Sequence, residues 1–290
     1  MGKSLADGYP AARRVFEEAD AALGFALSQL CFEGPEDQLK LTENTQPALL
    51  TVSIAAFAVL RDNGWTPDLV AGHSLGEYSA LVAAGSLSFG DAVRLVRNRG
   101  RYMQEAVPAG VGAMAAILKL PEGKLDAVLE QAAQGETLSA ANLNTLEQVV
   151  IAGHTGAVNR AIELAKAAGA KRGILLPVSA PFHCALMKPA QDRLRVDLDA
   201  TEFRDLECPL VNNWQAAEIR TGVEAREGLH RQVPSPVRWV ESVQRLAGLG
   251  AARFVEVGAG GVLTGLLRGI DPSLVGRRFG VPEELSALYG

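Results

Sequence analysis

One run of residues predicts both the fold and the chemistry of this chain, Leu69-Val70-Ala71-Gly72-His73-Ser74-Leu75-Gly76-Glu77-Tyr78-Ser79-Ala80. Apolar residues lead into a Gly-x-Ser-x-Gly pentapeptide, and small and apolar residues follow it, a pattern typical of strand, sharp turn and helix. We expect that a Cβ at either pentapeptide glycine would obstruct the turn. Ser74 would project from a helix N-terminus, where the Leu75 N–H is placed to hold an oxyanion. The run predicts a serine nucleophile for acyl transfer or hydrolysis; the alternative is a chance pentapeptide in a Gly- and Ala-rich turn.

Composition narrows the class of protein. The chain has 290 residues, 48% hydrophobic and 21% charged, with a formal net charge of −5, which suits one large α/β domain or one domain with a smaller insertion. The mild acidity gives no reason to expect nucleic acid or an anionic membrane as partner, and no apolar run approaches the length of a membrane span. Cys31, Cys184 and Cys208 lack metal-ligand spacing and fit reduced thiols. We expect a cytoplasmic monomer without a signal peptide, a metal or a tightly bound cofactor.

The order of elements predicts two structural parts. Helical patterns over Pro10 to Leu30 and Thr45 to Leu60 precede the buried strand Leu69 to Ala71, which favours a parallel sheet covered by helices. From Pro108 the expected order is β-α-β-β-α-β, the signature of a ferredoxin-like unit. The expected architecture is therefore α/β. Residues 1–107 and 179–290 would form a large α/β-hydrolase-like domain with a parallel sheet and a nucleophile elbow, and residues 108–178 an inserted ferredoxin-like subdomain that walls one side of the active site.

An arginine is predicted on the apolar face of a helix. The helix begins at the N-cap Ser88 and runs to about Glu105. At about 100° per residue, Arg99 projects toward the core instead of joining the other arginines of this helix. A buried arginine needs a partner, and two remain open: a structural ion pair, or a substrate carboxylate held near Ser74.

A serine nucleophile needs a base, and four histidines are available. His73 is discounted because adjacent side chains usually point apart, and His154 and His230 are expected at the surface. His183 lies where the chain would return to the large domain, so it is the candidate base, against the alternative of a structural junction histidine. No nearby carboxylate completes a triad, which leaves a backbone or amide carbonyl to orient the ring.

These motifs together resemble the malonyl-CoA:acyl-carrier-protein transacylases of bacterial fatty acid synthesis. The resemblance runs in the family's order from near the N-terminus to about Leu267. The matching segments are Gly72 to Ala80, Thr45-Gln46-Pro47-Ala48-Leu49, Val96-Arg97-Asn98-Arg99-Gly100, Val149 to His154, Pro181 to Met187, Gln232 with Pro236-Val237-Arg238-Trp239, and Glu256 to Gly260. As a set they are far more specific than the pentapeptide alone.

The resemblance implies a ping-pong transfer. Ser74, activated by His183, would take the malonyl group from malonyl-CoA, and acyl carrier protein would accept it on its phosphopantetheine thiol. Arg99 would clamp the malonyl carboxylate, the Leu75 N–H would serve the oxyanion hole, and the backbone carbonyl of Gln232 would orient the histidine. CoA thioester is a substrate here, and no cofactor or metal is implied.

One departure from the family is expected to matter. Family members begin with a strand and a Gly-Gln-Gly-Ser-Gln loop whose first glutamine donates a second N–H to the oxyanion hole, whereas Met1 to Ala6 matches the segment just after that loop. A truncated sequence or a start codon assigned too far downstream would explain the difference, and loss of one such donor costs roughly 10²–10³ in rate.

Two alternative functions also fit parts of the sequence. An ordinary α/β-hydrolase esterase is disfavoured because an ester of a neutral acid gives a buried Arg99 nothing to hold. The other is a non-catalytic remnant that binds the carrier protein, and the presence of Ser74, His183 and Arg99 disfavours it.

Overall fold

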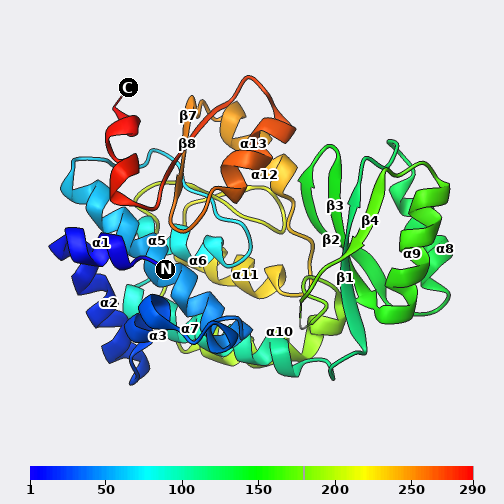
Figure 1. Ribbon diagram of the computed structural model, residues 1–290, viewed down its shortest axis with the longest axis horizontal. Helices are drawn as coiled ribbons and strands as arrows, with labels where there is room; N and C mark the ends of the chain where they lie inside the picture. The colour runs from blue at the N-terminus through cyan, green and yellow to red at the C-terminus, as the bar shows by residue number, and fades with distance from the viewer. Residues whose placement is uncertain (179, 290) are drawn as a thin grey trace.

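The computed structural model describes residues 1–178 and 180–289 and shows an α/β protein with two parts side by side. Figure 1 places a larger, helix-rich part at the left and a smaller part at the right, the latter built on the sheet β1 to β4 with α8 and α9 on its outer side. The smaller part comes from the middle of the sequence. The segments that precede and follow it in the sequence both belong to the larger part.

Helices dominate the first hundred residues. They are α1 (Lys3–Gly8), α2 (Pro10–Leu23), α3 (Leu27–Glu33), α4 (Glu36–Leu39), α5 (Thr42–Asp62), α6 (Gly76–Ala83) and α7 (Phe89–Glu105). The Ser88 hydroxyl accepts from the Asp91 N–H, which confirms the predicted N-cap of α7. Gly100 lets α7 lie close to the start of α5, since a Cβ there would stand 2.6 Å from the Thr42 carbonyl oxygen.

The predicted parallel sheet of the large part is divided. Within the described residues, the strand expected over 69–71 is reduced to a single parallel bridge between Val70 and Leu210. The strand β5 (Leu210–Val211) pairs antiparallel with β6 (Glu218–Ile219), and β7 (Arg253–Val257) pairs parallel with β8 (Val275–Phe279). Parallel pairing is therefore present in two places, and among the described residues no pairing joins β7 to the Val70 segment.

The smaller part has the predicted order of elements. It contains β1 (Gly112–Leu118), α8 (Leu125–Ala133), β2 (Leu138–Thr145), β3 (Gln148–His154), α9 (Thr155–Ala167) and β4 (Arg172–Leu175). All its strand pairs are antiparallel, in the spatial order β2-β3-β1-β4. The strand period of two divides the sheet into two faces. Ile117 packs in the cluster beneath α8 and α9, whereas Met114 packs on the opposite face with Phe182 and Cys184, beside His183.

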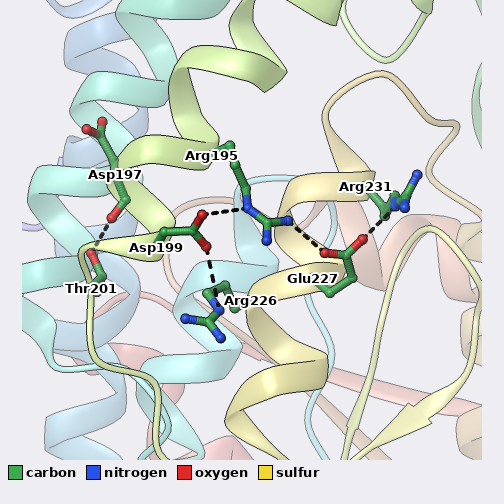
Figure 2. Close-up of polar contacts among 7 residues, drawn as sticks. All are labelled: Arg195, Asp197, Asp199, Thr201, Arg226, Glu227 and Arg231. Atoms are coloured by element: carbon green, nitrogen blue, oxygen red, sulfur yellow. Dashed lines mark hydrogen bonds and ion pairs between the residues drawn. The ribbon is translucent and has the colours of Figure 1, made fainter.

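The rest of the chain returns to the large part. Its helices are η1 (Ala185–Met187), α10 (Lys188–Asp199), α11 (Gly222–Gln232), α12 (Trp239–Gly248), α13 (Val262–Ile270), η2 (Pro282–Glu284) and η3 (Ser286–Leu288). Figure 2 shows ion pairs between α10 and α11: Arg195 of α10 contacts Asp199 of the same helix (2.8 Å) and Glu227 of α11 (2.9 Å). These ion pairs connect the helix that follows the His183 segment to the helix that ends at Gln232. Among the described residues, no helix combines the length and apolarity needed to cross a membrane.

Candidate active site

The nucleophile elbow forms between the Val70 bridge and α6. Ser74 has a φ of 53°, a left-handed conformation that is costly for a residue with a Cβ and is maintained only by its surroundings. A Cβ on Gly72 would stand 1.9 Å from the carbonyl carbon of Gly76, so glycine is required there. Gly76 has open space around its Cβ position. The expectation that both glycines are needed for the turn is thus wrong for Gly76.

The structure brings Ser74, His183 and Gln232 into one line of hydrogen bonds. Ser74 Oγ lies 2.7 Å from His183 Nε2, and His183 Nδ1 lies 3.1 Å from the backbone oxygen of Gln232. A carbonyl can only accept, so Nδ1 carries the proton and Nε2 is free to accept from the serine hydroxyl. The ring is oriented by a backbone carbonyl, one of the two alternatives that the sequence leaves open.

The surroundings of His183 keep its ring neutral. Burial is the main cause that lowers its pKa, the positive charge of Arg99 is the second, and together they bring the pKa to about 3. A neutral imidazole is the form that can take a proton from a hydroxyl group.

The other three histidines lie apart from this line. His73 points away from its neighbour Ser74, with Nε2 2.9 Å from Asn144 Oδ1 and its ring against Trp239. His154 ends β3 and accepts from the Thr137 N–H, and His230 is half-buried on α11. None of the three has a recorded contact with the Ser74 hydroxyl within the described ranges.

Arg99 is buried on the core side of α7, as its position in the helix predicts, with only 2% of its surface exposed. Its guanidinium donates to three neutral oxygen atoms: Gln46 Oε1 (2.7 Å), Ser74 Oγ (3.1 Å) and Gln232 Oε1 (2.9 Å). No ion pair with a carboxylate is recorded for it among the described residues. Its buried charge is solvated by amide and hydroxyl groups, and its Nε has no recorded partner among the described residues, so a ligand carboxylate could still pair with it.

The Leu75 N–H lies next to Ser74, the candidate nucleophile. Leu75 immediately precedes α6, and no acceptor is recorded for its N–H within the part of the chain that the structure describes. The neighbouring Ser74 N–H is already used, since it donates to Asn213 Oδ1 at 2.6 Å. Of these two adjacent amides, only that of Leu75 can receive a developing oxyanion.

Sequence reasoning gave no site role to Gln46, Glu77 or Asn213. Gln46 holds the guanidinium of Arg99, Asn213 holds the backbone of the elbow, and Glu77 is fully buried behind both Asn213 and Gln232. Two of them lie in conspicuous segments, Thr45-Gln46-Pro47 and the motif that continues after Ser74. Asn213 follows a two-residue strand, and its polarity alone does not distinguish it from Asn212.

Comparison with known proteins places this arrangement in a family. The family model described as acyl transferase domain matches residues 1–270. A malonyl CoA-acyl carrier protein transacylase of Escherichia coli (strain K12) is 48% identical over 288 residues, covering 99% of this chain and 93% of the relative. That of Bacillus subtilis (strain 168) is 50% identical over 275 residues, covering 94% and 87%.

Solved structures with the same fold carry names of the same family. An acyl carrier protein S-malonyltransferase from Vibrio cholerae matches with a TM-score of 0.97 at 45% identity, covering 99% of this chain and 94% of the other. A malonyl-transacylase solved in complex with a type II PKS acyl-carrier protein matches with a TM-score of 0.96 at 45% identity, covering 99% and 93%.

The fold and the serine site thus define an acyl transferase. More particularly, identity near 48% over almost the whole chain means that this protein belongs to the malonyl CoA-acyl carrier protein transacylase family.

Proposed function

We propose that this chain transfers the malonyl group of malonyl-CoA to the phosphopantetheine thiol of acyl carrier protein and so supplies fatty acid synthesis. The observation that carries the proposal is the contact of a buried guanidinium with a serine hydroxyl: Arg99 Nη2 lies 3.1 Å from Ser74 Oγ. Ser74 Oγ also lies 2.7 Å from a neutral histidine. A nucleophile, its base and a fixed cation for a carboxylate are therefore within reach of one small acyl group.

The first half of the reaction forms an acyl-enzyme. Ser74 Oγ attacks the thioester carbonyl while its proton moves to His183 Nε2, and the Leu75 N–H receives the oxyanion. The carbon–sulfur bond then breaks, and His183 returns the proton to the CoA sulfur, which leaves a malonyl-serine ester. The Gln232 carbonyl keeps Nδ1 protonated throughout, as the 3.1 Å contact supports.

The second half reverses these steps with a different thiol. The carrier's phosphopantetheine thiol gives its proton to His183 and attacks the ester carbonyl. Ser74 Oγ leaves, taking the proton back from His183 Nε2. Because CoA departs before the carrier arm enters, one site serves both thioesters in turn.

Arg99 makes the reaction selective for an acyl group that carries a carboxylate. The three oxygens to which it donates in the free protein are neutral, and Glu77 acts on it through charge without a direct ion pair, so a malonyl carboxylate would add a direct counter-ion. A neutral acyl ester offers no such gain, which disfavours the esterase reading.

Intact-protein mass after brief incubation with malonyl-CoA tests the proposal. We expect a malonyl adduct on the parent chain, none on Ser74→Ala, and loading slowed roughly 10- to 100-fold in Arg99→Ala, since a hydrogen-bonded charge pair contributes about 1.5–3 kcal/mol. Arg101→Ala, which removes an exposed guanidinium from the same helix, is the matched control and should load normally.

Two results would contradict the proposal. A folded parent chain that gains no malonyl mass would remove the assigned activity and favour a carrier-binding remnant. Equal loading of acetyl-CoA and malonyl-CoA, unaffected by Arg99→Ala, would remove the role of the arginine and favour a general esterase.

The same proposal covers the organisation of the protein. We assign residues 1–107 and 179–290 to an α/β-hydrolase-like domain and residues 108–178 to an inserted ferredoxin-like subdomain, on the strength of the order of β1 to β4. We assign a cytoplasmic monomer that needs no cofactor or metal, consistent with a net charge of −5 and sparse cysteines.

A further inference from the structure

A fully buried carboxylate lies directly behind the nucleophile. Glu77 is on the first turn of α6, three residues after Ser74, with no exposed surface. One oxygen, Oε2, accepts from the Asn213 N–H at 2.9 Å and from Gln232 Nε2 at 2.8 Å. The other oxygen, Oε1, has no recorded partner among the described residues. Burying a carboxyl group costs free energy, and the two hydrogen bonds that it accepts offset only part of that cost. Its presence behind the elbow therefore calls for an explanation.

The two partners of Glu77 hold three successive peptide groups of the elbow. Asn213 Oδ1 accepts from the Ser74 N–H at 2.6 Å, and Asn213 Nδ2 donates to the Gly72 carbonyl at 2.7 Å. Gln232 Nε2 donates to the Ser74 carbonyl at 3.0 Å. A residue at a φ of 53° persists only when its surroundings fix it. Ser74 is held by these side chains together with the Glu77 N–H, which donates to the Ser74 carbonyl at 3.1 Å.

Glu77 also contributes to the orientation of the Gln232 amide. The NH₂ end of Gln232 donates to Glu77 Oε2 and to the Ser74 carbonyl, and its oxygen therefore faces Arg99 at 2.9 Å. A reversed amide would set an NH₂ group against the guanidinium. The same residue presents its backbone oxygen to His183, so the orientation of Gln232 affects the nucleophile, the base and the cation together.

We propose that Glu77 is a positioning residue of the transfer reaction: by accepting hydrogen bonds from Asn213 and Gln232, it holds Ser74 in its strained conformation and Gln232 Oε1 toward Arg99. The inference deepens the function proposed above and rests on it. Glu77 touches neither the acyl group nor the reacting atoms. Its hydrogen bonds go to two neutral amides, and no ion pair joins it to Arg99 among the described residues, so the guanidinium can still pair with the ligand.

Glu77→Gln is the conservative variant. Burial raises the pKa of Glu77 to about 7, so a neutral side chain is already close to the native state at neutral pH. An amide oxygen in the place of Oε2 can still accept both bonds, and its NH₂ group would take the unpartnered place of Oε1. Glu77→Leu keeps much of the volume and removes both acceptors.

The test measures how fast Ser74 reacts with a neutral alkyl fluorophosphonate, by intact mass, beside kcat and KM for malonyl transfer. We expect Glu77→Leu to slow labelling and kcat about 100-fold, the loss that a displacement of about 1 Å can cause, with KM changed less than threefold. Glu77→Gln should stay within about threefold of the parent. Ser86→Ala is the control: it breaks another buried hydrogen bond, 2.6 Å to the Arg204 carbonyl, and should lower Tm without slowing labelling.

Several outcomes would overturn the inference. A folded Glu77→Leu that labels like the parent, or a Glu77→Gln as slow as Glu77→Leu, would show that these accepted bonds do not position Ser74. If Glu77→Leu does not fold, Asn213→Ala takes its place. It removes the contacts to Ser74 and Gly72 but keeps the backbone N–H that faces Glu77, and normal labelling of that variant would equally refute the inference. Fluorophosphonate labelling needs no malonyl group, so a parent that labels but takes no malonyl refutes only the proposed function.

Discussion

The protonation state of His183 has a measurable consequence at the scale of one residue. A free histidine with a pKa of about 6.5 would lose roughly tenfold of its neutral form between pH 7.5 and pH 5.5. Burial and the Arg99 charge hold the pKa of His183 at about 3, so the ring stays neutral over that interval. We expect the fluorophosphonate labelling rate of the parent chain to fall less than twofold from pH 7.5 to pH 5.5.

Arg99→Met provides the comparison. Removing the second-largest cause of the shift should raise the pKa of His183 toward 6.5, so labelling of this variant should begin to fall at a higher pH than in the parent. The sign is fixed, because a nearby positive charge disfavours the protonated ring. A parent rate that already falls tenfold by pH 5.5 would show that the ring is more easily protonated than its burial implies.

Some residues of the candidate site could be predicted from the sequence, and others could not. Ser74 and Arg99 could be placed because each breaks a pattern: a serine between two glycines, and a charge on an apolar helix face. Asn213 and Glu77 could not be given roles, because their partners are 139 and 155 positions away in the sequence, in the contacts Ser74–Asn213 and Glu77–Gln232 respectively. Hydrogen bonds over such separations depend on the fold and leave no local period.

At the scale of an element, the elbow depends unequally on its two glycines. A Cβ at Gly72 would meet backbone atoms of Gly76 and Glu77, at 1.9 Å and 2.5 Å, which cannot move without displacing the start of α6. We expect Gly72→Ala to cost about 3 kcal/mol, the upper end of the range for overpacking, and to abolish labelling of Ser74. Thermal unfolding with fluorophosphonate labelling measures both effects.

Gly76→Ala is the matched control for the same element. Open space surrounds its Cβ position, and alanine is a better helix former than glycine by up to about 1 kcal/mol. Its Tm should therefore be unchanged or higher. Equal destabilisation by the two substitutions would mean that the elbow is tight at both positions, as the sequence alone suggested.

The elements around the elbow divide into those with a local signal and those without. The start of helix α7 could be predicted from its N-cap Ser88 and from Asp91. The four strands of the smaller part could be predicted from short apolar runs separated by turns and helices. Strands β5 and β6 are two residues long and have no period to detect. The neighbours of each strand in the large part could not be predicted, because apolar runs such as 69–71 show that a strand is buried without showing which strand lies beside it.

At the scale of the whole molecule, the smaller part also supports the segment that carries the proposed base, His183. One face of its sheet packs on α8 and α9, and the other packs on the segment that carries His183. The His183 backbone has a φ of 59°, a conformation that persists only when its surroundings fix it, and the sheet supplies part of those surroundings.

Neighbouring positions on β1 separate the two roles of the smaller part. Met114 is 4% exposed and packs with Phe182 and Cys184, whereas Ile117 is 2% exposed and packs beneath α8 and α9. Truncation of either to alanine leaves a cavity and should cost about 2–5 kcal/mol in unfolding free energy. Only the Met114→Ala cavity adjoins the histidine segment, so we expect it to lower kcat for malonyl transfer about tenfold, while Ile117→Ala keeps the parent kcat. Urea unfolding and steady-state kinetics on the two variants measure the difference. Equal kcat values at similar losses of stability would mean that the large part holds His183 by itself and that the smaller part serves another purpose.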